Sequence, residues 1–152
     1  MSSFTLRVYG ICIENGSVLV SDEYIYKKYV TKFPGGGLHF GEGTIECLKR
    51  EMVEETMQEV EVLEHFYTTD FFVPSAFDPA KQVMSIYYLV NFIAPIKFRL
   101  SEKVFDFAEL KNDAQSFRWI KLSELKAEDF TLPIDKRVGE LLAAKYKLPA
   151  AW

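Results

Sequence analysis

The chain has few cysteines and histidines, the residues that bind zinc and form redox sites. Its 152 residues include two cysteines, Cys12 and Cys47, with no C-x-x-C pair, and two isolated histidines, His39 and His65. A structural zinc site needs four such ligands at short spacings, so a zinc domain is not expected. We expect the cysteines to be small buried residues in a reducing compartment, without a disulfide.

The chain also lacks an excess of positive charge and long apolar runs. Its formal net charge is -4 and its pI is about 5.3. This balance argues against a protein that binds a nucleic-acid polymer, because such proteins usually present a basic face. No stretch approaches 18 consecutive apolar residues, and the N-terminal segment has no apolar signal core. We therefore expect a cytoplasmic protein with no membrane partner.

The composition is that of a globular protein, with 49% hydrophobic and 15% aromatic residues. The length suits one domain over residues 1–152, since no repeat, low-complexity segment or linker divides the chain. Runs of β-branched and aromatic residues predict strands, and Asn15-Gly16 predicts a tight turn between the first two. The expected strands are 4–13, 17–22, a short one within 24–33, 59–73, 82–95 and 116–122, with 95–100 extending the fifth or forming another.

Two longer helices and one shorter helix are expected. Over 44–57 the residues Ile45, Leu48, Met52 and Thr56 recur at spacings of three and four, which predicts one buried stripe, and Thr44 is placed to cap the start. A second helix is expected over 132–147, with Pro133 near its first turn. A short helix is expected over 123–130 and a surface loop over 101–115. This order is not a regular βα alternation, so it predicts an α+β fold or an α/β/α sandwich with a mixed sheet.

The first helix carries three glutamates on one face. Glu51, Glu54 and Glu55 are spaced i, i+3 and i+4, and each like-charged pair on a helix face costs a few tenths of a kcal/mol. A hard divalent cation would relieve this repulsion, because Mg²⁺ prefers carboxylate oxygens. A solvated acidic face is the commoner explanation of E-x-x-E-E taken alone, so the pattern by itself leaves both explanations open.

A glycine-rich loop, "FPGGGLHFGEG" over 33–43, comes directly before this helix. Glycine lets the backbone approach a ligand closely, and a helix start offers free N–H groups. The loop is not a G-x-x-x-x-G-K-[ST] phosphate loop, because Glu42 follows Gly41. It is not G-x-G-x-x-G either, because Phe40 stands where the last glycine belongs. The loop and the acidic helix therefore have to be interpreted together.

Together they resemble the Nudix box, G-x5-E-x7-R-E-U-x-E-E-x-G-U, where U is a bulky aliphatic residue. Six of its seven fixed positions match over 23 residues, and Met52 suits the first U. The matching residues are Gly36, Glu42, Arg50, Glu51, Glu54 and Glu55. The Pro-Gly-Gly lead-in and "FRWIKLSEL", which is similar to the family's late strand ending in Trp, extend the resemblance along the chain.

The box departs from the family pattern at its end and in its spacer. Met57 replaces the last glycine, and Gln58 replaces an aliphatic residue. That glycine ends the helix in a left-handed turn, which Met57 adopts only at a cost, so we expect a helix one turn longer or a different end. His39 lies where active relatives often carry Glu. It has lost a metal contact, faces the substrate, or is an exposed histidine without a ligand, and we favour the last.

The resemblance implies a hydrolase that uses Mg²⁺ or Mn²⁺ to cleave the diphosphate linkage of a nucleoside diphosphate derivative. The implied partner is a small molecule, either a nucleotide sugar or a nucleoside triphosphate. A longer loop at 73–82 slightly favours the nucleotide sugar. A homodimer is the common default for small enzymes.

The resemblance also implies a role for each box residue. Glu54 and Glu55 correspond to the principal metal ligands, Glu51 to a further ligand or the general base, and the carbonyl of Gly35 to another ligand. Arg50 is expected to orient a glutamate, and Glu42 to pair with Arg50 or the helix start. The base is either a box glutamate or a later acid, and the later candidates are Glu102, Asp106, Glu109 and Asp113.

Two alternatives remain. The first is a non-catalytic Nudix-like module that binds a nucleotide as a sensor or serves as an interaction domain. Such modules usually lose box glutamates, whereas this chain keeps Glu51, Glu54 and Glu55. The second is a small α+β domain with an accidental acidic helix, which requires the whole box match to arise by chance.

Overall fold

The computed structural model describes residues 2–146 and divides into two compact units, each built from two stretches of the chain. The first unit takes in the residues up to Ile13 and Phe33–Phe98. The second takes in Glu14–Lys32 and the residues from Arg99 onward. Each unit has its own strands and one α-helix.

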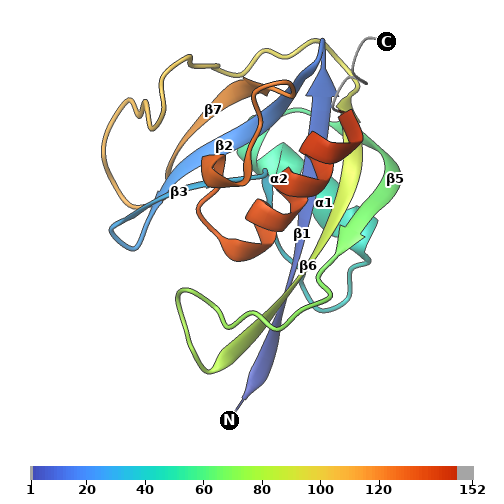
Figure 1. Cartoon of the computed structure of the whole chain (residues 1–152), viewed down its shortest axis with the longest axis vertical. Helices are drawn as coiled ribbons and strands as arrows, with labels where there is room; N and C mark the ends of the chain where they lie inside the picture. The colour runs from blue at the N-terminus through green and yellow to red at the C-terminus, as the bar shows by residue number, and fades with distance from the viewer. Residues whose placement is uncertain (1, 147–152) are drawn as a thin grey trace. The chain divides into compact units, whose positions relative to one another are not determined.

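The first unit contains a mixed arrangement of strands and the helix that carries the glutamates. β1 and β6 run parallel and side by side, in register from Ser3↔Lys81 to Cys12↔Val90 (Figure 1). The short strand β4 is antiparallel to β1, and β5 is antiparallel to β6. The elements of this unit are β1 (Ser3–Glu14), β4 (Gly35–Gly37), α1 (Thr44–Thr56), β5 (Val60–Thr68) and β6 (Lys81–Phe92).

Helix α1 packs closely on β1 and β6 because a glycine lies at the contact. A Cβ on Gly10 would lie 3.1 Å from Val90 and 3.5 Å from Leu48, so a larger residue would push the helix away. Leu48 and Met52 of α1 are fully buried. Tyr87 packs against the rings of Tyr9 and Phe33, with centroid distances of 5.2 and 5.7 Å. The core of the first unit thus fixes α1 against the strands.

The second unit is an antiparallel set of strands with the second helix. β2 pairs with β3 on one side and β7 on the other, both antiparallel. Helix α2 buries Val138 and Leu142, and Gly139 leaves room for the ring of Phe130, which a Cβ would approach to 2.8 Å. The elements are β2 (Ser17–Ile25), β3 (Lys28–Lys32), β7 (Ala114–Lys121), the 3₁₀ turn η1 (Ala127–Asp129) and α2 (Pro133–Tyr146).

Two tight turns use left-handed residues, and the sequence revealed only one of them. Asn15 and Gly16 have φ of 49° and 76°, which confirms the predicted turn between β1 and β2. Tyr26 and Lys27 have φ of 47° and 64° and join β2 to β3. Neither residue favours this conformation, so pairing of the flanking strands imposes it. β2 therefore runs on to Ile25, further than predicted.

The start of α1 differs from the expectation in two ways. The capping residue is Gly43, whose N–H donates to the Glu46 carboxylate at 3.3 Å, and Thr44 is already the first helical residue. The prediction of a Thr44 cap is wrong, because its hydroxyl is hydrogen-bonded to that of Tyr88 at 2.7 Å instead. Ile45 was also predicted to be buried, but its side chain is 45% exposed.

The end of α1 corrects the expectation for Met57. The helix ends at Thr56, and Met57 takes the left-handed conformation with φ 60° and ψ 19°. Its N–H donates to the carbonyl of Val53 at 2.8 Å, as in a glycine cap. A helix one turn longer is therefore ruled out. The hydroxyl of Thr56 donates to the carbonyl of Met52 at 2.6 Å and secures the last turn.

The remaining segments agree in part with the predictions from the sequence. Residues 93–100 form no strand, apart from a single bridge between Leu100 and Phe117. The loop expected over 101–115 ends at 113, because β7 begins at Ala114, and the helix expected over 123–130 shortens to η1. Pro133 begins α2, as predicted, and the predicted last residue of that helix, 147, lies outside the described residues. Within residues 2–146 no helix is long and apolar enough to span a membrane.

Candidate active site

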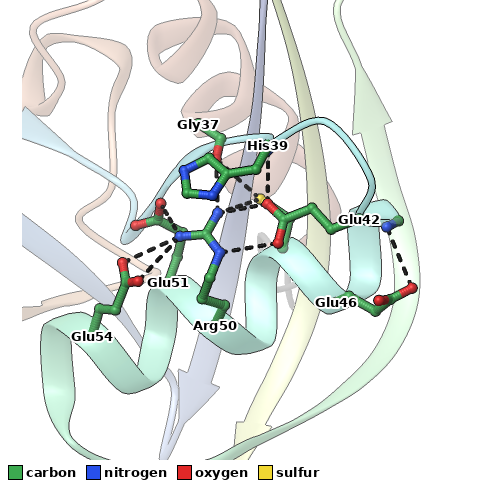
Figure 2. Close-up of polar contacts among 9 residues, drawn as sticks. Gly37, His39, Glu42, Glu46, Arg50, Glu51 and Glu54 are labelled. Atoms are coloured by element: carbon green, nitrogen blue, oxygen red, sulfur yellow. Dashed lines mark hydrogen bonds and ion pairs between the residues drawn. The ribbon is translucent and has the colours of Figure 1, made fainter.

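The candidate site lies in the first unit, where β4 leads through a turn over 38–43 into α1. Figure 2 shows the side chains of α1 directed toward this turn, with Arg50 between Glu42 and the pair Glu51 and Glu54. All of these residues belong to one continuous stretch of the chain. The local order of strand, turn and helix therefore positions the site.

The glycines of β4 bring the backbone close to two of the glutamates. A Cβ on Gly36 would lie 2.5 Å from the carboxyl carbon of Glu51, so only glycine leaves room for this carboxylate. Gly35 has a φ of 140°, and its N–H donates to Glu55 Oε2 at 2.9 Å. The structure thus places Glu51 and Glu55 against the glycine backbone.

Arg50 binds Glu42 with two parallel hydrogen bonds, which is one of the two roles that the resemblance implied for Glu42. Arg50 Nε donates to Glu42 Oε2 at 3.0 Å, and Nη2 donates to Oε1 at 2.6 Å. Nη2 also donates to the carbonyl of Gly37 at 2.9 Å. The backbone N–H of His39 donates to Glu42 Oε1 at 2.8 Å. Arg50 and Glu42 therefore fasten both ends of the turn to α1.

These contacts keep the two residues charged. The hydrogen bond from Arg50 and then that from the N–H of His39 lower the pKa of Glu42 from 4.5 to about 2. The hydrogen bond to Glu42 in turn raises the pKa of Arg50. At neutral pH the pair is thus a permanent ion pair.

The other side of the guanidinium faces two more carboxylates. Arg50 Nη1 donates to Glu51 Oε1 at 2.9 Å, and to the two oxygens of Glu54 at 3.3 and 3.2 Å. The side chain of Glu51 is 15% exposed, while that of Glu54 is 56% exposed. One arginine therefore serves three carboxylates, which leaves the cluster with an excess of negative charge.

The residue types at this site are those that a hard divalent cation prefers as ligands. Glu51, Glu54 and Glu55 supply carboxylate oxygens on one helix face, and the missing Cβ at Gly36 leaves a cradle for the first of them. Within residues 2–146 no three acidic, histidine or cysteine side chains stand close enough together to hold a metal ion. The Nη1 group of Arg50 pairs with both Glu51 and Glu54 and supplies the positive charge between these two carboxylates.

One contact of the site was missed at the sequence level. Cys47 is buried, as expected for both cysteines, and its thiol donates to the carbonyl of Gly37 at 3.5 Å. It also accepts from Arg50 Nη2 at 3.7 Å. Burial, and then the charge of Glu42, raises the pKa of Cys47 to about 11, so it stays a neutral thiol. Its spacing from Arg50, three residues along a helix, was the available signal.

The structure assigns no role to the other candidate residues. The side chain of His39 is exposed at the turn. In the second unit, Asp106 accepts from Ser101 at 2.6 Å and from Arg99 at 2.8 Å, and the Ser101 hydroxyl is the main cause of its lowered pKa. The acids Glu102, Glu109 and Asp113 are exposed residues of the same unit. Which acid is the general base stays a prediction.

Comparison with protein families settles the family. The model of the NUDIX domain matches residues 4–142. The chain belongs to the Nudix family. The predicted membership of the Nudix family is thereby confirmed. A search of curated proteins finds no match.

Solved structures confirm the fold, a Nudix-type α/β/α sandwich with a mixed sheet. The E. coli ORF135 protein is 19% identical with a TM-score of 0.70, and the match covers 99% of this chain and 96% of that one. A MutT structure from a study of Aliivibrio salmonicida and Vibrio cholerae is 19% identical with a TM-score of 0.63, covering 94% and 99%. An ADP-ribose pyrophosphatase from Streptococcus suis is 15% identical with a TM-score of 0.60, covering 97% and 95%.

Proposed function

We propose that this Nudix protein cleaves the diphosphate linkage of a nucleoside diphosphate derivative, with Mg²⁺ or Mn²⁺ as cofactor. The observation that carries the proposal is the meeting of the glycine strand with two glutamates of α1, where Glu55 accepts from the N–H of Gly35 and Glu51 packs on Gly36. An acidic protein holds an anionic diphosphate best through a cation of this kind.

The cation would be held by Glu51, Glu54, Glu55 and the carbonyl of Gly35. When bound, such a cation neutralises phosphate oxygens and lowers the pKa of a coordinated water. Arg50 acts as a positioning residue, because its contacts with Glu42 and Gly37 hold the turn while Nη1 holds Glu51. Glu51 is either a further ligand or the base that accepts a proton from the attacking water.

The substrate is a small molecule, either a nucleotide sugar or a nucleoside triphosphate. Two structures with the same fold are named an ADP-ribose pyrophosphatase and a UDP-X diphosphatase, which supports a nucleoside diphosphate joined to another group. We further propose that the two units together make one Nudix domain, since the family match runs through both. The protein would be cytoplasmic, without a nucleic-acid polymer or membrane as partner, and a homodimer is the default assembly.

The test is a hydrolysis panel read out as phosphate release. The substrates are nucleoside triphosphates, nucleotide sugars, ADP-ribose and dinucleoside polyphosphates, each with Mg²⁺, with Mn²⁺ and with a chelator. We expect turnover that needs the cation and falls at least about a hundredfold in Glu54→Gln, since a lost ligand removes several kcal/mol of charge stabilisation.

The matched control is Glu140→Gln, which removes an exposed helical glutamate that pairs with Arg137 on α2. It should keep wild-type turnover. Turnover of no substrate, or equal turnover by wild type and Glu54→Gln, would refute the proposal. Tight nucleotide binding in calorimetry without hydrolysis would support the non-catalytic sensor instead.

A further inference from the structure

Arg50 has an acceptor for each of its five N–H groups. Nε and Nη2 serve Glu42 and the carbonyl of Gly37, and Nη1 serves Glu51 and Glu54. A guanidinium is a rigid planar fork, so these two sets of partners lie on opposite sides of it, as Figure 2 shows. The two sides can therefore be compared as separate contacts of one group.

The side toward Glu42 is the firmer of the two. The two bonds to Glu42 form a parallel bidentate pair, and the side chains of Arg50 and Glu42 are only 25% and 15% exposed. The bonds from Nη1 to Glu54 are longer, at 3.2 and 3.3 Å, and Glu54 is 56% exposed. Exposed ion pairs of this kind contribute little stability, so Glu54 is the partner most easily released.

The carboxylates on the Nη1 side are also the ones proposed to bind a divalent cation. A cation at Glu51 and Glu54 would stand beside Nη1, and two positive charges competing for the same oxygens repel each other. Glu55 does not face this competition in the same way, because it is bonded to the N–H of Gly35.

We propose that a divalent cation displaces Arg50 Nη1 from Glu54, while Nε and Nη2 keep Glu42 and Gly37. Arg50 Nη1 is thus the counter-ion of the site when no cation is bound. It lowers the repulsion between Glu51 and Glu54 until a cation binds and replaces it at Glu54. The inference rests on the proposed function, which supplies the cation. It adds that the Nη1 group of Arg50 loses its contact with Glu54 when the cation binds. The turn over 38–43 stays fastened to α1 throughout this exchange.

An alternative arrangement, in which Arg50 keeps its contact with Glu54, predicts the opposite change in cation affinity for one conservative variant. If Arg50 kept Glu54 and presented it to the cation, removing Nη1 would weaken cation binding. If Nη1 competes with the cation, removing it strengthens binding. Arg50→Lys tests this, because lysine keeps the charge but has a single ammonium that cannot serve both sides.

The first experiment is calorimetric titration of the full chain with Mg²⁺ and with Mn²⁺, without substrate. We expect Arg50→Lys to bind each cation about threefold more tightly than wild type, the size expected for release of a partly exposed ion pair. The control is Arg137→Lys, an exposed helical arginine of α2 paired with Glu140, and it should match wild type. Weaker or unchanged binding by Arg50→Lys, or no cation binding by wild type at millimolar concentration, would overturn the proposal.

The second experiment measures the wild type, and a variant serves only to assign the signals. Arginine side-chain ¹⁵N resonances of the wild type are followed as Mg²⁺ is added, and the Arg50 signals are assigned by their absence in Arg50→Lys or by contacts to Glu42. We expect the Nε–H signal to stay in place and slowly exchanging, while the Nη1 hydrogens exchange faster. A shift of Nε together with Nη1, or no change in either while the cation binds, would overturn the proposal.

Neither readout depends on turnover. If both experiments give the expected result and the hydrolysis panel is blank, the partner exchange stands and the proposed activity fails. If hydrolysis requires the cation but Arg50→Lys binds it more weakly, the activity stands and the exchange fails.

Discussion

Two arginine–carboxylate clusters, one in each unit, have different charge balances. In the second unit, Arg118 binds Asp22 with two hydrogen bonds of 2.7 and 3.2 Å, and Asp22 is fully buried. The hydroxyl of Thr31 and the N–H of Phe105 fill the remaining acceptor sites at 2.6 and 3.1 Å. In the first unit, Arg50 faces three carboxylates that are partly open to solvent.

The difference separates a structural ion pair from the ion pairs of the proposed site. The Asp22 pair is balanced and its acceptors are satisfied, so removing one partner leaves a buried charge alone, and the pair holds strands and loop together. The Arg50 cluster carries unbalanced negative charge at a glycine turn, an arrangement that costs stability unless something else neutralises it. Stability should therefore depend most on the Asp22 pair, and activity should depend most on the Arg50 cluster.

The largest expected effect on stability comes from breaking the balanced pair. Asp22→Ala should lower the free energy of unfolding by about 3 kcal/mol, because it strands the guanidinium of Arg118 and releases the N–H of Phe105. Urea denaturation measures the change. Glu140→Gln, which breaks the exposed pair with Arg137, should lose less than about 0.5 kcal/mol. Equal losses in the two variants would contradict the comparison.

The next effect is on activity and comes from filling the glycine cradle of the Arg50 cluster. Gly36→Ala puts a Cβ 2.5 Å from the carboxyl carbon of Glu51 and should lower kcat/KM about a hundredfold by misplacing that carboxylate. Gly37→Ala is the matched control. Its Cβ would meet nothing nearer than Arg7 Nη1 at 3.8 Å, and its carbonyl is kept. Steady-state kinetics decide the point, and a Gly37→Ala loss as large as that of Gly36→Ala would contradict it.

A smaller effect concerns acid stability of the Arg50 cluster. The pKa of Glu42 is lowered from 4.5 to about 2 in the folded state, so its contribution to stability is complete above pH 4.5. That contribution is lost as the pH falls from 4.5 through 2. The stability gap between wild type and Glu42→Gln should therefore shrink over this range. Urea denaturation between pH 7 and 2 measures the gap, and a gap independent of pH would contradict the ion pair.

The smallest effect separates helix stability from the charge cluster on the same helix. Met57→Gly relieves the left-handed conformation at the end of α1 and should raise the free energy of unfolding by up to about 1 kcal/mol. The kinetic constants should not change, since Met57 is 85% exposed and its N–H bonds to Val53, outside the Arg50 cluster. Met57→Ala is the control and should give no gain. Destabilisation by Met57→Gly would show that the surroundings favour methionine.

The helix ends show where sequence reasoning failed. Helix α1 was predicted correctly because its apolar spacing is periodic. Its buried face was misassigned at one position, because packing against the strands buries Cys47 and leaves Ile45 exposed. Thr44 was misassigned as the cap because its hydroxyl pairs with Tyr88. Met57 was expected to prolong the helix or to give it a different end, because its intrinsic preference is against the left-handed region. The chain must turn there to begin β5, and that tertiary demand overrides a local cost of about 1 kcal/mol.

The sequence by itself determined that a glycine turn leads into a helix with three glutamates on one face, because helical periodicity and glycine's freedom are local properties of the chain. The resemblance carried by this spacing predicted the family and the fold, and it implied that Glu42 pairs with Arg50 or with the helix start. Only the folded structure decided how the three glutamates differ. Glu55 binds Gly35, Glu51 packs on Gly36 and Glu54 stays largely in solvent on Arg50 Nη1. Three identical side chains on one helix face acquire these differences from the backbone that packs against them, and no local pattern contains that information.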